Sequence, residues 1–507
     1  KRTINSWHEK QRILSFFGRL NYDFKDKYLL SFVFRRDGYS SLLGDNRWGF
    51  FPGVSAGWIF GREDFIKEAI PVMSFGKLRA SYGINGNASG IGAYTLQGSY
   101  GSSNSNGSFN YNGNTSYLIT ELPNPNLRWE KTATFEVGAD LSFFANRLNT
   151  NLTYYNRLTS DKYAALSFPT STGFSSVTNN NGEFRNQGIE IELSGKIIDS
   201  KDWTWSASGN IAFNKNKIVS LPDNGMERNR INAFQVYTGN GDEKKWVGGQ
   251  QEGQEPGILY LYQADGIYRS YDEIPANLVR KYGSRTYYGP EAWNKLTAEQ
   301  QNATTNFPIQ PGDTKFHDVN GDDVIDEFDK VKVGATSPRW TGGFNTTLRW
   351  KNFQLYGRFD YALGFWLYEN SGTQSTTPWF MGCYQGTYNT PTMYYDTWSE
   401  SNPNAKYPRY LFADQNGKNN YIASTMFAYR GDYLAIREIS LSYSLPESVA
   451  KMLKMQRAEV SITGQNLGYI TGAKNVGSPE ANPKDNGAVG QGYSLPRTIL
   501  FGVNLTF

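Results

Sequence analysis

The sequence contains almost no cysteine and almost no histidine. Among its 507 residues, Cys383 is the single cysteine, and His8 and His317 are the two histidines. A lone cysteine excludes an internal disulfide and a zinc site built from several cysteines. A Ser or Cys hydrolase would need a nucleophile near one of the histidines, and the sequence places none there. Neither a nucleophile elbow nor a glycine-rich phosphate loop lies between a strand and a helix. We therefore expect no enzymatic activity.

Long hydrophobic runs and an excess of charge are also missing. No stretch of about 18 apolar residues occurs, which argues against a transmembrane helix. The 51 Lys and Arg residues are nearly balanced by 47 Asp and Glu residues, so nothing indicates nucleic acid binding. No charged and then apolar signal segment opens the chain at Lys1, so we expect processing or the choice of boundaries to have removed it.

Aromatic residues are abundant, and apolar residues recur at every second position. Aromatics make up 15% of the chain. In the segment 203–213, Trp203, Ile211 and Phe213 share one face with small residues, whereas the other face carries mostly Ser, Thr and Asn. A soluble β-sandwich shows such alternation in shorter strands. Aromatic density at the strand ends favours a transmembrane antiparallel β-barrel, an all-β fold with one face toward lipid and one toward water.

The alternation predicts about thirteen strands. They span 11–23, 27–36, 48–60, 75–83, 132–144, 147–160, 186–196, 203–216, 340–350, 353–364, 433–445, 458–469 and 497–507. Tight turns alternate with long polar connections at about 85–130, 161–185, 217–338, 365–431 and 470–496. Short turns at one end and long extracellular loops at the other are typical of outer-membrane barrels.

The odd number of strands has a consequence for the whole protein. Single-chain bacterial barrels have even numbers of strands, so this chain needs further strands to close. We therefore interpret residues 1–507 as the C-terminal portion of a longer barrel protein. A miscounted hairpin is the simpler alternative.

The final residues, RTILFGVNLTF, keep the two-residue period to the end. We expect Ile499, Phe501, Val503, Leu505 and Phe507 to face lipid. Thr498, Asn504 and Thr506 would then face the lumen, and the C-terminus would be periplasmic. A terminal Phe after alternating apolar residues also resembles the signal by which the barrel-assembly machinery recognises its clients.

Seven motifs in order together resemble the SusC family of TonB-dependent outer-membrane transporters. They are RWGFFP at 47–52, KLRASYG at 77–83, NPNLRWE at 124–130, RNQGIE at 185–190, GATSPRWTGGFN at 334–345, GQNL at 464–467 and LPRT at 495–498. The resemblance implies part of a 22-stranded barrel in the outer membrane of a Gram-negative, Bacteroidetes-like bacterium. It implies TonB-dependent import of glycans or peptides with a SusD-like surface lipoprotein. The N-terminal plug and TonB box of the family are not recognisable, which leaves energy coupling without support from these residues.

One acidic segment has the spacing of a twelve-residue calcium loop. Its ligands would be Asp318, Asn320, Asp322, the Val324 carbonyl, Asp326 and Asp329, in the order of positions one, three, five, seven, nine and twelve. Position six, normally Gly, is Asp323, which tolerates a left-handed backbone better than most residues. The resemblance includes a similar stretch, so we expect Ca²⁺ or Mg²⁺ there, pinning the loop. The alternative is an acidic turn that hydrogen-bonds its own backbone.

Two long connections are rich in Tyr and Trp. These residues suit a sugar ring or a protein partner, or they pack the loops against each other. The first connection carries Trp246, Tyr260, Tyr262, Tyr268, Tyr287, Tyr288 and Trp293, and the second carries Trp379, Phe380, Tyr384, Tyr388, Tyr394, Tyr395 and Trp398. They leave open a second function, in which a structural or secretion-associated barrel holds proteins through its loops.

Overall fold

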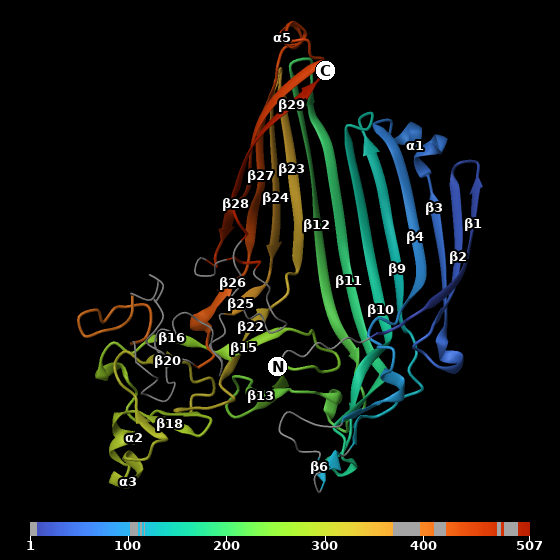
Figure 1. Cartoon of the computed structure of the whole chain (residues 1–507). Helices are drawn as coiled ribbons and strands as arrows, with labels where there is room; N and C mark the ends of the chain where they lie inside the picture. Colours follow the sequence, from blue (N-terminus) through green and yellow to red (C-terminus); the bar gives the residue numbers. More distant parts are fainter. Residues whose placement is uncertain are drawn as a thin grey trace. The chain divides into compact units, whose positions relative to one another are not determined.

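Long antiparallel strands dominate the computed structural model of the chain (Figure 1). The structure describes residues 8–101, 110–111, 114–115, 117–368, 396–409, 422–473, 478–480 and 495–507. Within this part of the chain, no helix has the length and apolarity needed to cross a membrane. The chain divides into two units, one formed by 1–231, 250–256 and 344–351 and the other by 232–249, 257–343 and 352–507.

The thirteen predicted long strands are all present, and they pair in the order β1-β2-β3-β4-β9-β10-β11-β12-β23-β24-β27-β28-β29. Their bounds are β1 Ile13–Phe24, β2 Tyr28–Tyr39, β3 Trp48–Trp58, β4 Met73–Asn87, β9 Glu130–Phe143, β10 Leu148–Ser167, β11 Ser176–Asp199, β12 Trp203–Ser220, β23 Trp340–Trp350, β24 Phe353–Leu363, β27 Tyr433–Ser444, β28 Arg457–Thr471 and β29 Thr498–Thr506. The strands pair with their neighbours in sequence and these pairings are antiparallel, so the predicted antiparallel arrangement is confirmed.

Tight turns link alternate strands, as predicted. Lys25 and Asp26 adopt positive φ between β1 and β2, and Ala145 and Asn146 do so between β9 and β10. The connection at 161–185 is shorter than predicted, because β10 and β11 continue past the alternating segment and pair up to Ser167 and Ser176. The hydrophobic period alone does not reveal that extension.

The first unit holds additional short elements in its long connections. They are β5 Ser99–Gly101, β6 Asn110–Tyr111, β7 Asn114–Thr115, β8 Leu118–Glu121 and the helix α1 Asp64–Ala69. The core of this unit lies among its connections rather than within the sheet. Leu42, Leu96, Leu127 and Trp129 are buried there beside Phe51 of β3.

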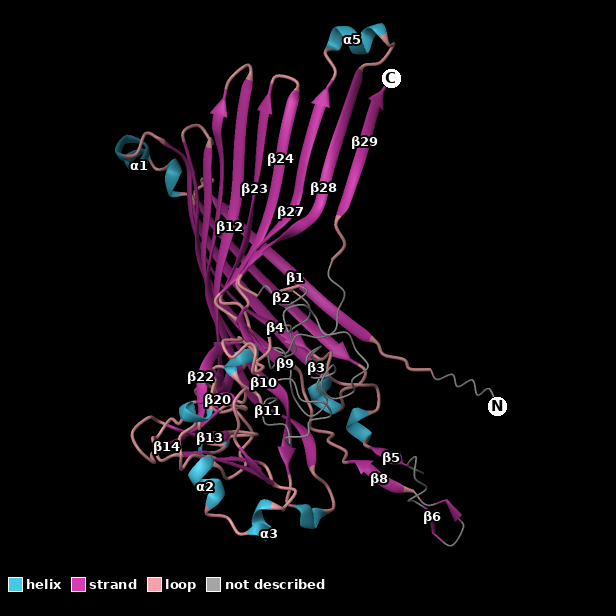
Figure 2. Cartoon of the chain, turned by 90° about the vertical axis from the view of Figure 1, so that its left-hand side faces the viewer, coloured by secondary structure: helices cyan, strands magenta, loops and turns pink. Residues whose placement is uncertain are grey.

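Parts of two connections, the one between β12 and β23 and the one between β24 and β27, form a compact region of the second unit. We call it the loop domain; it is made of residues 232–249, 257–339, 366–368, 396–409 and 422–430. Its strands are β13 Phe234–Tyr237, β14 Lys244–Val247, β15 Ile258–Tyr262, β16 Ala264–Ile267, β17 Val279–Tyr282, β18 Arg285–Tyr288, β19 Asn306–Pro308, β20 Thr314–Phe316, β21 Val324–Ile325, β22 Lys330–Ala335, β25 Trp366–Tyr368 and β26 Ala428–Arg430. Its helices are α2 Pro290–Asn294 and α3 Ala298–Gln301, and α5 Glu447–Met452 lies between β27 and β28 (Figure 2). Two aromatic clusters form the core of the loop domain.

Candidate functional site

The strands of the first unit separate apolar and polar side chains onto opposite faces of the sheet. Leu20 of β1 lies beside Phe32 of β2, and Phe32 lies beside Val54 of β3; all three are exposed. The same register places Asn21 opposite Ser31 on the other face. An exposed apolar face this extensive is suited to lipid, and the opposite face is suited to water.

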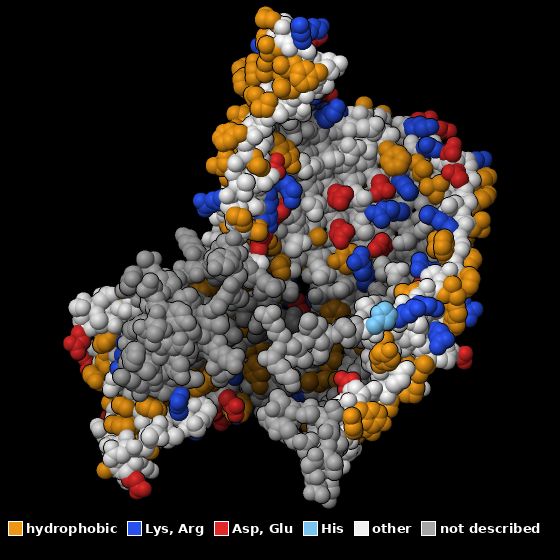
Figure 3. Space-filling model, viewed as in Figure 1, with side chains coloured by type: hydrophobic (Ala, Val, Ile, Leu, Met, Phe, Trp, Pro, Cys, Tyr) orange, Lys and Arg blue, Asp and Glu red, His pale blue; other side chains and the backbone are white. Residues whose placement is uncertain are grey.

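The polar face carries charges of both signs. Figure 3 shows Lys and Arg interspersed with Asp and Glu over a hollowed surface. The recess over β1–β4 and β9 is lined by Arg19, Asn21, Ser31, Lys77, Arg79 and Glu136, among others. We call these residues, together with Asp140 and Arg157, the polar wall.

Arg79 of β4 is the best-connected cation of the polar wall. Its Nε donates to Asp140 Oδ1 of β9 at 3.3 Å, and its Nη2 donates to Asn151 Oδ1 of β10 at 2.9 Å. Gly138 makes room for this side chain, because a Cβ built there would lie 2.7 Å from Arg79 Cζ. The guanidinium thus bridges three neighbouring strands.

A second ion pair extends the wall. Arg157 Nη2 of β10 lies 3.3 Å from Glu136 Oε1 of β9, and its guanidinium lies over the Tyr155 ring. Because these cations have partners within the wall, the surface offers hydrated hydrogen-bonding groups of both signs rather than one strong field.

The predicted metal ligands lie in one loop before β22, but their carboxylates accept hydrogen bonds from the loop itself. Asp318 accepts from the N–H groups of Gly321 and Asp323, both at 2.8 Å. Asp329 is fully buried and accepts from Val319 and Asp326 at 2.9 and 2.7 Å. Asp322 and Asp326 accept from Val324 and Phe328 in the same way.

This geometry matches the hydrogen-bonded acidic turn that was the alternative to a metal site. Among the described residues, no three acidic, His or Cys side chains converge as a metal site requires. The left-handed conformation expected at Asp323 is present, with φ of 60°. Burial raises the pKa of Asp329 to about 6. The side-chain Oδ1 of Asn320, the predicted ligand at position three, is buried without a hydrogen-bond partner.

The aromatic residues of the first long connection largely form the core of the loop domain. Tyr262, Tyr268 and Tyr287 are buried, so they pack the loops together. Of the second group, Trp398 donates its Nε1 to the Arg269 carbonyl, and the other six lie outside the described residues. His317 pairs with Asp265 at 3.0 Å, and His8 is exposed.

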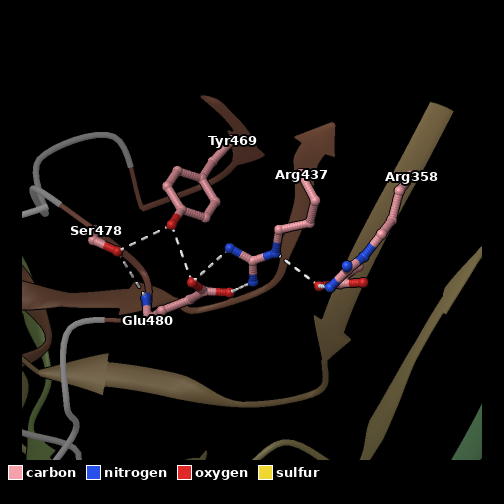
Figure 4. A network of polar contacts seen from close by, with 6 residues as sticks. Arg358, Arg437, Tyr469, Ser478 and Glu480 are labelled. Carbon is pink, nitrogen blue, oxygen red and sulfur yellow. Dashed lines mark hydrogen bonds and ion pairs between the residues drawn. The ribbon is translucent and has the colours of Figure 1, made fainter. Parts of the chain in front are cut away.

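The structure also reveals a polar network that sequence reasoning missed (Figure 4). Arg437 of β27 donates to Asp360 of β24 and to both carboxylate oxygens of Glu480, which lies in the connection between β28 and β29. Tyr469 of β28 donates to Glu480 Oε2 at 3.1 Å. No short motif marks this network, because its members come from four separate segments.

Comparisons with known proteins agree with this architecture. A family model described as "TonB dependent receptor-like, beta-barrel" matches residues 2–288. The chain is 29% identical to "TonB-dependent receptor P3" of Formosa agariphila, over 99% of this chain and 46% of that protein. It is 27% identical to "TonB-dependent receptor SusC" of Bacteroides thetaiotaomicron, over 100% of this chain and 45% of that protein. The chain thus spans about half the length of the curated relatives it matches.

Solved structures show the same fold. The structure described as the RagAB peptide transporter has a TM-score of 0.69 and 23% identity, covering 98% of this chain and 48% of that chain. The RagAB peptide importer in its open-open state gives a TM-score of 0.70 and 24% identity, covering 98% of this chain and 47% of that chain. Because the family model matches more than half of the chain and the strands have one apolar and one polar face, the chain belongs to the family of TonB-dependent, SusC-like receptor barrels of the outer membrane.

Proposed function

We propose that the whole protein of which this chain is a part imports glycans or peptides through the outer membrane, driven by TonB. The polar wall carries this proposal, because its paired charges line one face of a barrel whose other face is apolar. The family supplies the reaction class, and the similar RagAB structures are described as peptide transporters. A SusD-like lipoprotein over the loop domain is the partner we propose.

Deletion strains test the import proposal. The strain of origin, a deletion of the full-length gene and a deletion of tonB would each grow on a mixture of peptides and glycans, with depletion of each solute followed by mass spectrometry. We expect the same solutes to remain undepleted in both deletion strains, and re-expression of the full-length gene to restore their depletion. Unchanged depletion in both deletion strains would contradict import.

A structural or secretion-associated barrel is the second candidate. The observation in its favour is the buried aromatic core of the loop domain, which gives the loops a fixed outer surface suited to holding a protein. Purification of the intact complex separates the two candidates. A SusD-like lipoprotein in that complex supports import, whereas surface proteins without any such lipoprotein support the second candidate.

We also propose a structural role for Ca²⁺ or Mg²⁺ in the 318–329 loop, in which Asp318, Asn320, Asp322, Val324, Asp326 and Asp329 would hold the ion. The unpartnered Asn320 Oδ1 supports this, although the carboxylates would have to turn from the backbone toward the ion. Trypsin cleavage at Lys330 in the presence of Ca²⁺ or of a chelator tests it. Equal cleavage in both conditions would leave only the hydrogen-bonded turn.

A further inference from the structure

The carboxylate of Glu480 lies among donors that fit it closely. Arg437 donates from Nη1 to Glu480 Oε2 at 3.0 Å and from Nη2 to Oε1, a two-pronged contact. The hydroxyl groups of Tyr469 and Tyr433 also bond to this carboxylate. The two tyrosine rings meet edge to face, with centroids 5.9 Å apart. We call Arg437, Tyr433 and Tyr469 the Arg437 cradle.

An irregularity in strand pairing places the arginine in the cradle. Arg358 and Phe359 are consecutive in β24 and pair with Glu438 and Ile436 of β27, respectively. Arg437 lies between those two residues of β27 and therefore has no partner on β24. A bulge of this kind changes the direction in which a side chain points. Asp360 then accepts from Arg437 Nε at 2.7 Å, which orients the guanidinium so that its two outer nitrogens face Glu480.

The charges around the cradle indicate what it binds. With Glu480 in place, Arg358 and Arg437 are balanced by Asp360 and Glu480. Without Glu480, the cradle would carry one uncompensated positive charge. It would also lack an acceptor for the two outer nitrogens of Arg437 and for two hydroxyl donors. A planar carboxylate satisfies this set of donors, and the nearby Asp360 disfavours a doubly charged phosphate.

Glu480 is supplied by a connection and not by the strands that build the cradle. It is part of the segment 478–480, where its backbone N–H donates to the Ser478 hydroxyl (Figure 4). The side chains of Arg437 and Glu480 remain 17% and 20% exposed, so a solute can reach the site. A carboxylate of the chain itself therefore occupies a site that a solute carboxylate would also fit.

We propose that the Arg437 cradle binds the carboxylate of a solute, such as the C-terminus of a peptide or a uronic acid, and that Glu480 competes for it from within the chain. This deepens the proposed import function by assigning it an acidic class of solute. Solute binding frees Glu480 and its segment from the sheet.

A binding assay on the full-length protein, purified in detergent, tests this assignment. The probes are N-acetyl-trialanine and its C-terminal amide, which differ only at the carboxylate, and a second pair consists of glucuronic acid and glucose. We expect Glu480→Ala to strengthen binding of the acidic probe about tenfold, because it removes a competing charge-assisted contact. Binding of the amide should not change. The probe pair with the larger difference in affinity between its acidic and neutral members identifies whether the carboxylate comes from a peptide or from a sugar.

Two further variants and one control variant test the interpretation. In the Glu480→Ala background, Tyr469→Phe should weaken acid binding several-fold, and Arg437→Met should abolish the difference between acid and amide. Glu459→Ala, which removes a carboxylate paired with Arg457 on β28, is the matched control and should leave both probes unchanged.

Equal affinity of Glu480→Ala for acid and amide would overturn the proposal, as would a retained preference for the acid in Arg437→Met. If Glu480→Ala is cleaved faster near position 480 but does not bind the acidic probe more tightly, Glu480 only holds its segment against the sheet. Binding is measured on purified protein, so a failure of import in cells would not contradict binding of the carboxylate. A failure of binding would likewise not contradict import.

Discussion

Glu63 shows how a single side chain fixes a short connection. Its carboxylate accepts from Lys27 Nζ at 2.8 Å, from the Tyr28 hydroxyl at 2.9 Å and from Trp58 Nε1 at 3.3 Å. It therefore joins the turn between β1 and β2 to the end of β3. The hydrogen bond from Lys27, followed by those from Tyr28 and Trp58, lowers the pKa of Glu63 from 4.5 to about 2.

The lowered pKa predicts acid sensitivity of this connection. A carboxyl whose pKa falls on folding contributes stability above its ordinary value of 4.5, and that contribution is lost as pH falls toward about 2. Pepsin cleavage near Phe60 and Phe65, normalised to a free peptide, should rise between pH 4 and about pH 2. Glu63→Gln should be cleaved equally at both pH values. A variant that keeps the wild-type pH profile would contradict this role.

Gly138 gives a second prediction at this scale. A Cβ there would lie 2.7 Å from Arg79 Cζ and 2.8 Å from the Leu152 carbonyl oxygen. We expect Gly138→Ala to destabilise the barrel by about 1–3 kcal/mol, as overpacking does. Gly53→Ala is the control, because its Cβ would meet nothing closer than 3.8 Å. Denaturant unfolding of the two purified variants measures the difference, and equal midpoints would argue against crowding at Gly138.

At the scale of elements, the acidic loop before β22 depends on Asp329. This buried carboxylate joins the two ends of the loop through Val319 and Asp326. Asp329→Ala would leave two backbone N–H groups without their acceptor, at about 1–3 kcal/mol each where they stay buried. Tryptic cleavage at Lys330 should therefore accelerate, whereas the exposed neighbour Glu327→Ala should cleave like the wild type. Equal rates for both variants would mean that other contacts hold the loop.

The strands were predictable because a single rule determines them. Alternation of apolar and polar residues is required wherever a strand separates lipid from water, and it marks all thirteen long strands in the sequence. The short strands of the loop domain were not predicted, because they are only two to six residues long and a two-residue period does not stand out over so few positions.

The site was less predictable than the strands. The spacing of the acidic loop predicted a metal site, which stays a prediction, and left a hydrogen-bonded turn as the alternative; the loop forms such a turn, with Asp323 in the left-handed conformation. The polar network at Arg437 depends on one unpaired residue in β27 and on Glu480, 43 positions away. Local sequence carries no signal for a contact set by strand register and by a distant connection.

At the scale of the whole molecule, the two faces of the sheet determine where a charge is tolerated. Leu441 and Ser442 are neighbours in β27 and lie on opposite faces, with Leu441 opposite Leu355 and Ser442 opposite Gln354. An arginine on the lipid face costs about 2–4 kcal/mol at the bilayer midplane, and a lumen position does not carry this cost. Leu441→Arg should therefore lower the amount of heat-modifiable folded protein in outer-membrane fractions.

Ser442→Arg is the matched control for this substitution and should reach the membrane at wild-type levels. Equal levels of both variants would contradict the assignment of the apolar face to lipid. Only insertion into a membrane distinguishes the two variants, so their levels must be compared in cells.

The composition of the loop domain determines when it can fold. Its core unites Leu259 and Leu261 with Tyr368, Tyr407 and Phe427, and Arg409 reaches back to the buried Asp313 at 2.7 Å. Between these two parts the chain runs through β23 and β24. The early part of the loop domain therefore waits for strands synthesised after it, and contacts of such long sequence separation form slowly. Closure of this core therefore cannot precede synthesis of β23 and β24, which separate its two parts in the sequence.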